Sequence, residues 1–180
     1  PRKVITTGEG GMITTNDKDI AARLRRLRHH GMSVSDLERH NANNVIIESY
    51  SETGYNYRMT DMQAAMGIVQ MKKLPEILQK RLSIAKRYNE AFSKIDYIRV
   101  PGIPSYARHN YQSYWIEMLK NSPLSRDELM IKLLEKGIAS RRGIMAIHKE
   151  QCYSAYDVSL PMTERITSNT IILPLYPSMT

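Results

Sequence analysis

The order of periodic segments after residue 74 constrains the fold of this chain more than any other feature. A helix with apolar side chains at core spacing is predicted from Pro75 to about Lys94. A second helix opens at the capping box Ser125 to Glu128 and ends at Gly137. Short runs of β-favouring residues predict strands at 97–100, 111–119, 138–142 and 171–173. This order predicts a small α/β domain with helices packed on a mostly antiparallel sheet.

Residues 1–73 have a different pattern and are interpreted as the closing part of another domain. A short strand is expected at residues 11–15. Asn16 and Asp17 then offer N-caps for a helix whose apolar face is Ile20, Leu24 and Leu27, and Gly31 is placed to end it. We therefore expect two domains, residues 1–73 and residues 74–180.

The segment between these helices is a long excursion. Residues 32–52 are rich in Ser, Asn and charge, and long ordered loops are more often functional than idle. A capping box from Thr60 to Gln63 starts the next helix, which runs through Val69. Pro75 suits the first turn of a separate helix after it.

Composition indicates an ordinary folded protein. Hydrophobic residues make up 42% of the 180 residues and charged ones 24%. The net charge of +8 raises the alternative of nucleic-acid binding, but much of the excess lies in residues 23–30, where leucines fall at helical spacing. A solvated helix face is the favoured interpretation, because no zinc-finger spacing or aromatic basic platform is present. We expect no nucleic-acid partner and no metal site.

The sequence also bears on compartment. No apolar run approaches the roughly 20 residues that cross a bilayer, and the first residues contain no signal-peptide core. Cys152 is the single cysteine and cannot form an internal disulfide, which fits a reducing compartment. We expect a cytoplasmic protein that does not interact with a membrane.

Three motifs point to a family: Lys3 followed by TTGEGG at residues 6–11, GYNYRM at residues 54–59 with the helix start after it, and LPLYP at residues 173–177. Together they resemble the DegT/StrS-type sugar-nucleotide aminotransferases. The resemblance implies the C-terminal part of a fold type I transferase that depends on pyridoxal 5'-phosphate (PLP). This part contains the end of the large domain and a small α/β domain.

The resemblance implies a role for Lys3 and one for Asn56. Lys3 is the lysine that holds PLP as a Schiff base, and it is both catalytic and cofactor-binding. Asn56 reaches across a homodimer interface to the PLP phosphate of the partner subunit. Without the resemblance, Lys3 reads as a surface charge and Asn56 as a turn residue, and both alternatives stay open. Lysine at position 3 also argues against a dehydratase-like branch, which carries histidine there.

Two further candidates come from residues 141–148, which resemble the segment that approaches the nucleotide sugar. Arg142 is expected to pair with the diphosphate, and His148 to contact the sugar. The alternatives are a surface charge for Arg142 and a satisfied structural histidine for His148.

The resemblance implies a transaminase that converts a nucleotide-linked keto sugar to an amino sugar, as in polysaccharide biosynthesis, with glutamate as the usual donor. A PLP enzyme also needs a ring-binding carboxylate and a stacking group, which in this family lie upstream of the lysine. We therefore expect a fragment truncated at both ends and inactive by itself. The alternative is a noncatalytic dimerisation or interaction module of the same fold.

Overall fold

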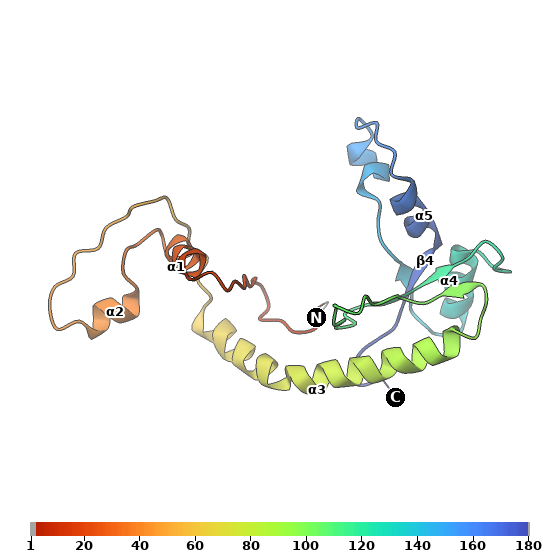
Figure 1. Ribbon diagram of the computed structural model, residues 1–180, viewed down its shortest axis with the longest axis horizontal. Helices are drawn as coiled ribbons and strands as arrows, with labels where there is room; N and C mark the ends of the chain where they lie inside the picture. The colour runs from red at the N-terminus through yellow and green to blue at the C-terminus, as the bar shows by residue number, and fades with distance from the viewer. Residues whose placement is uncertain (1–2, 180) are drawn as a thin grey trace. The chain divides into compact units, whose positions relative to one another are not determined.

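The computed structural model describes residues 3–179 (Figure 1). By its contacts the chain divides into two compact units, residues 5–72 and residues 73–179, and residues 3 and 4 group with the second unit. The division falls inside one helix, α3 (Asp61–Phe92). Each unit is described by itself below.

The first unit contains α1 (Lys18–Leu27) and α2 (Asp36–Asn41) ahead of α3. Asp17 caps α1 as predicted, because its side chain accepts hydrogen bonds from the amides of Asp19 and Ile20. Gly31 has φ +77° and its amide donates to the Arg26 carbonyl, so it closes the turn after the helix, although α1 itself ends at Leu27. The predicted strand at residues 11–15 is wrong. No ladder pairs with this segment in the described chain, and a strand forms only against a partner.

The excursion at residues 32–52 is more ordered than its composition indicates. It carries α2, which begins at a capping box in which Ser35 and Glu38 satisfy each other's backbone amides. Its two ends are tied together, since the Ser33 amide donates to the Ser49 carbonyl at 2.9 Å. This helix was not predicted, although the spacing of its capping box, Ser35 to Glu38, is visible in the sequence.

Helix α3 starts at the predicted capping box. The Thr60 amide donates to Gln63 Oε1 at 3.0 Å, and the Gln63 amide to Thr60 Oγ1 at 3.3 Å. The expected break before Pro75 is wrong, because one helix of 32 residues continues through it. Proline removes one backbone donor and crowds the preceding turn, at a cost of about 3 kcal/mol. The unbroken turns on both sides and the packing of the later part of α3 on the core offset that cost.

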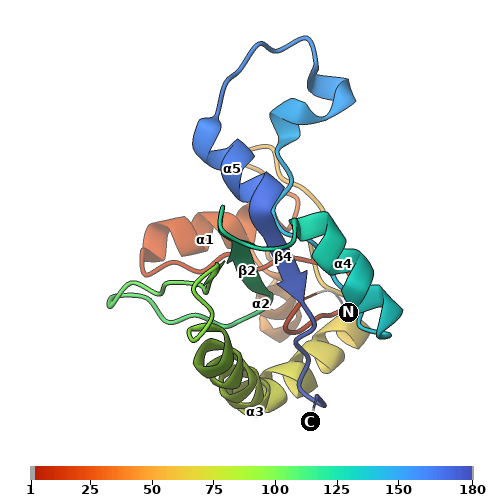
Figure 2. The ribbon, with the colours of Figure 1, turned by 90° about the vertical axis from the view of Figure 1, so that its right-hand side faces the viewer.

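The second unit is built on a four-stranded antiparallel sheet in the order β1-β2-β4-β3. The strands are β1 (Ile98–Arg99), β2 (Tyr114–Met118), β3 (Arg141–Arg142) and β4 (Thr170–Leu173). Each lies inside or within one residue of a predicted segment. Beside them lie α4 (Arg126–Glu135), whose capping box at Ser125 is present, and α5 (Pro161–Asn169) (Figure 2).

The core lies between the second half of α3 and the sheet. Ile84 and Ala85 of α3 pack with Tyr114, Ile116 and other buried residues of β2, β4 and the segment after β4. The Tyr114 hydroxyl donates to Asn89 Oδ1 at 2.6 Å, and burial raises the pKa of Tyr114 above its ordinary value. The later part of α3 thus packs on the sheet, in agreement with the predicted packing of helices on an antiparallel sheet.

Arg81 links α3 to two irregular segments. Its guanidinium donates to the carbonyl oxygens of Tyr111 at 2.7 Å and of Gln112 and Leu175 at 3.3 Å. Burial lowers the pKa of Arg81 below its ordinary value, but an arginine remains charged. The side chain thus satisfies three carbonyl oxygens outside the regular ladders.

Candidate active site

The glycine-rich turn after Lys3 adopts the tight conformation that its sequence predicts. Gly8 and Gly10 have φ +89° and +140°, which residues with a Cβ rarely adopt. The Gly8 amide donates to Thr6 Oγ1 at 3.0 Å, and Gln63 Nε2 donates to the Glu9 carbonyl at 3.3 Å. The same Gln63 side chain that caps α3 therefore holds the turn against the helix start.

Lys3 is exposed. Within residues 3–179 its amine makes no ion pair and no hydrogen bond. Nothing in the described chain therefore occupies the amine.

Backbone hydrogen bonds fix the segment that carries Asn56. The Tyr55 amide donates to the Leu27 carbonyl, the His30 amide to the Tyr55 carbonyl, and the Tyr57 amide to the Arg28 carbonyl, at 2.6 to 3.0 Å. Asn56 is thereby bridged to His29 in antiparallel fashion. The segment after α1 sets the position of Asn56, five residues before α3 begins.

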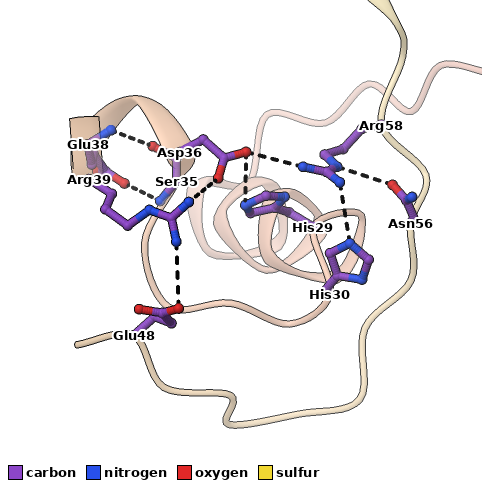
Figure 3. A network of polar contacts seen from close by, with 9 residues as sticks. All are labelled: His29, His30, Ser35, Asp36, Glu38, Arg39, Glu48, Asn56 and Arg58. Carbon is purple, nitrogen blue, oxygen red and sulfur yellow. Dashed lines mark hydrogen bonds and ion pairs between the residues drawn. The ribbon is translucent and has the colours of Figure 1, made fainter. Parts of the chain in front are cut away.

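The Asn56 side chain belongs to a polar network (Figure 3). Its Oδ1 accepts a hydrogen bond from Arg58 Nε at 3.1 Å, and Arg58 Nη1 donates to Asp36 Oδ2 at 3.1 Å. Arg58 Nη2 lies 3.4 Å from His30 Nε2. Three groups from three different segments therefore surround one guanidinium.

His29 is the buried member of this region. Its Nε2 lies 3.6 Å from Asp36 Oδ2, beyond hydrogen-bonding distance, and neither ring nitrogen has a hydrogen-bond partner among the described residues. An open cavity of about 530 Å³ lies beside it, and its lining includes Arg25, Arg26 and Arg28. The walls carry both signs of charge, since Asp36 and Glu38 line it as well.

The two substrate-binding candidates lie in the second unit, and each pairs with its own carboxylate. Arg142 in β3 is exposed and its Nη2 lies 3.2 Å from Glu150 Oε1. The His148 side chain is 8% exposed, with its Nε2 3.1 Å from Glu164 Oε1. This hydrogen bond is the largest cause that holds the pKa of Glu164 below its ordinary value.

A cavity of about 300 Å³ lies beside the sheet of the second unit. Arg141, rather than Arg142, lines it, together with Gln112, Ser113 and three apolar residues. Arg142 and His148 are thus held by separate ion pairs. Within the described chain, no hydrogen bond or ion pair joins these two side chains.

Two absences can be stated for residues 3–179. No three metal-ligating side chains cluster closely enough to hold an ion. None of the helices there combines the length and apolar character that crossing a membrane requires.

Comparison with known proteins decides the family. The model of the DegT/DnrJ/EryC1/StrS aminotransferase family matches residues 1–180. The chain belongs to this family. A curated relative from Shewanella sediminis, named UDP-4-amino-4-deoxy-L-arabinose--oxoglutarate aminotransferase, is 32% identical over 98% of this chain and 48% of its own length.

Solved structures of two aminotransferases share the fold of this chain. The aminotransferase TlmJ from Streptoalloteichus hindustanus is 29% identical, with a TM-score of 0.76 over 98% of this chain and 45% of that one. The aminotransferase from Psychrobacter cryohalolentis is 25% identical, with a TM-score of 0.85 over 98% of this chain and 49% of that one. The expected fold class is confirmed.

The chain spans about half the length of the curated relatives that it matches. The family match covers all 180 of these residues.

Asp36 and Arg58 were not among the predicted site residues. Arg58 lies in the GYNYRM motif, two residues after Asn56, so the signal for it was present. No motif marks Asp36. It lies 22 residues before Arg58, and the two side chains meet only because the tertiary structure brings the excursion beside the GYNYRM motif.

Proposed function

We propose that the whole protein is a PLP-dependent aminotransferase that converts a nucleotide-linked keto sugar to an amino sugar. The observation that carries the proposal is the amine of Lys3, which pairs with no residue of the described range 3–179 and precedes the glycine-rich turn, in a chain whose full length matches this aminotransferase family. The name of the Shewanella sediminis relative, a sugar-nucleotide aminotransferase, supports the substrate class. By analogy with that name and the family's usual donor, glutamate supplies the amino group.

The residues present fit the proposed cofactor. Lys3 offers an amine that nothing in the described chain occupies. Asn56 offers its amide nitrogen as a donor, because Arg58 already occupies the amide oxygen. A donor just before a helix start suits an anion such as a phosphate. PLP, when bound, supplies the electron sink for the chemistry at the donor's Cα.

Lys3 then has two tasks. Its amine holds the cofactor covalently until the amino donor replaces it. With PLP and the amino donor bound, the released amine would act as a general base and then as a general acid, and would move the proton from the donor's Cα to C4′ of the cofactor. The second half of the cycle reverses these transfers on the keto sugar.

Asn56 binds the phosphate of the cofactor in the partner subunit, so that each active site needs two chains of a homodimer. Arg142 pairs with the diphosphate of the nucleotide sugar, and His148 contacts the sugar. The ion pairs of Arg142 with Glu150 and of His148 with Glu164 then hold these side chains until the substrate replaces or joins them.

We further propose that residues 1–73 close a large cofactor domain, that residues 74–180 form the small domain, and that the protein is cytoplasmic. By themselves the 180 residues are expected to be inactive, since the chain spans half the length of the relatives. The test is a transaminase assay of residues 1–180 beside the whole protein, in which equal activity would contradict this expectation.

The central test is chemical. The whole protein is loaded with PLP, treated with borohydride, digested, and searched for the reduced cofactor by peptide mass spectrometry. We expect the adduct on Lys3 and none in a Lys3→Arg variant. An adduct on another lysine, or no adduct, would remove the aminotransferase proposal and favour a noncatalytic dimerisation module of the same fold.

A further inference from the structure

The guanidinium of Arg58 connects Asn56 to the excursion at residues 32–52. Arg58 Nε donates to Asn56 Oδ1 and Nη1 donates to Asp36 Oδ2, both at 3.1 Å. The guanidinium is planar and its donors have fixed directions. Where Asp36 holds Nη1 therefore decides where Nε meets Asn56 (Figure 3).

The hydrogen bond from Arg58 also decides which end of the Asn56 amide faces outward. A carboxamide has an oxygen that accepts and a nitrogen that donates. Because Arg58 Nε–H occupies the oxygen, the reverse orientation would set two donors against each other. Asn56 is thus held with its amide nitrogen hydrogen-bonded to none of the residues that the structure describes, which is the orientation that an anion requires.

Asp36 is itself held on both oxygens. Oδ1 accepts from Arg39 Nη2 at 3.2 Å, while Oδ2 accepts from Arg58. Arg39 Nη1 lies 3.6 Å from Glu48 Oε1, across the excursion. Asp36 is half-buried and occupies the first position of α2, immediately after the Ser35 cap. The carboxylate is therefore hydrogen-bonded to two guanidinium groups, one on each oxygen.

We propose that Asp36 is a positioning residue that acts through Arg58 to keep the Asn56 amide oriented toward a phosphate group. The proposal rests on the proposed function, in which Asn56 binds the cofactor phosphate. It assigns the excursion a task, since α2 supplies the carboxylate that anchors Arg58.

The test compares two ligands that differ only in the phosphate. Dissociation constants for PLP and for pyridoxal are measured by equilibrium dialysis on the whole protein and on Asp36→Asn. Loss of one charge-assisted hydrogen bond should weaken PLP binding about tenfold. Pyridoxal binding should be unchanged. Asp19→Asn is the matched control, because it removes an exposed carboxylate of the first unit whose side chain makes no hydrogen bond or ion pair with Asp36, Arg39 or Arg58 in the described chain. It should bind both ligands normally.

Asn56→Ala separates the two proposals. It should lose affinity for PLP and not for pyridoxal, and Asp36→Asn should add no further loss in the Asn56→Ala background. If Asn56→Ala binds PLP as the unmodified protein does, the phosphate role of Asn56 fails and the Asp36 proposal fails with it. If Asn56→Ala behaves as expected but Asp36→Asn binds PLP normally, or weakens both ligands equally, only the Asp36 proposal is overturned.

Discussion

The backbones of Gly31 and Gly54 lie in contact, and neither position has room for a side chain. A Cβ on Gly54 would lie 2.0 Å from the Gly31 amide nitrogen, and a Cβ on Gly31 would lie 2.1 Å from the Glu52 carbonyl oxygen. The contact brings the end of the α1 turn against the start of the segment that carries Asn56. Two glycines 23 positions apart are therefore part of one arrangement.

Gly54→Ala should destabilise this arrangement strongly. The atoms it meets are backbone and cannot rotate away, so we expect a loss of about 2–4 kcal/mol in the free energy of unfolding, measured by urea denaturation of the whole protein. Gly11→Ala is the control, since a Cβ there meets nothing within 4 Å. A Gly54→Ala protein as stable as the control would show that the two backbones do not approach this closely.

Glu117 gives a second prediction, because it is a buried carboxylate between two arginines. Its side chain is 2% exposed, with Arg99 Nη1 at 3.0 Å and Arg165 Nη1 at 2.5 Å. Replacing both arginines by methionine leaves an uncompensated buried charge and should cost about 3–5 kcal/mol.

Adding Glu117→Met to that double variant should restore most of the stability, since an apolar triad needs no desolvation of charge. The stabilities of the unmodified protein, the double variant and the triple variant are compared by their urea unfolding midpoints. A triple variant that is less stable than the double would show that the carboxylate contributes more than its pairing with the two arginines.

Local contacts of this protein could be predicted from the sequence, whereas contacts that depend on tertiary structure could not. The capping boxes at Thr60 and Ser125 were predicted because a cap depends on residues three positions apart. The ends of β2 were not predicted correctly, because they are set by the register with β4, in which Tyr114 pairs with Leu173. The continuation of α3 through Pro75 was missed for a similar reason, since tertiary packing outweighed the local tendency of proline to start a new helix.

The candidate site follows the same division. Lys3, the glycine turn and Asn56 could be selected because each lies in a contiguous motif. The contact between Arg58 and Asp36 could not be predicted. It forms only after residues 27–30 pair with residues 55–57 and α2 comes within hydrogen-bonding distance of Arg58. Long-range side-chain partners are set by tertiary structure, which a pattern along one chain does not contain.

Glu164 should make stability depend on pH. Hydrogen bonds from His148, then from the Leu160 amide, hold its folded-state pKa below the ordinary value of 4.5. A lowered pKa stabilises the fold above the unfolded value and loses that contribution as pH falls through the folded one. The difference in unfolding free energy between the unmodified protein and Glu164→Gln should therefore be full at pH 6 and shrink below about pH 4.5.

The check is chemical denaturation across that pH range. A His148→Leu background should shrink the pH-dependent part of the Glu164→Gln effect, because the largest cause of the lowered pKa is gone. A difference that stays constant from pH 6 to pH 3 would contradict the assignment.

The proposed sharing of active sites between subunits predicts the outcome of mixing two inactive variants. If Lys3 of one chain and Asn56 of its partner serve the same site, a hybrid dimer of Lys3→Ala and Asn56→Ala has one site with both changes and one site with neither. Random reassembly makes half of the dimers hybrid, so about a quarter of the original activity should return on mixing. Each variant alone should stay inactive or nearly so.

Activity that does not recover would mean that Lys3 and Asn56 of the same chain serve one site, because every site in a hybrid would then carry one substitution. Two controls make a negative result informative. Hybrids must be shown to form, by native mass spectrometry of protomers that carry different tags. The unmodified protein, taken through the same dissociation and reassembly, must recover its activity.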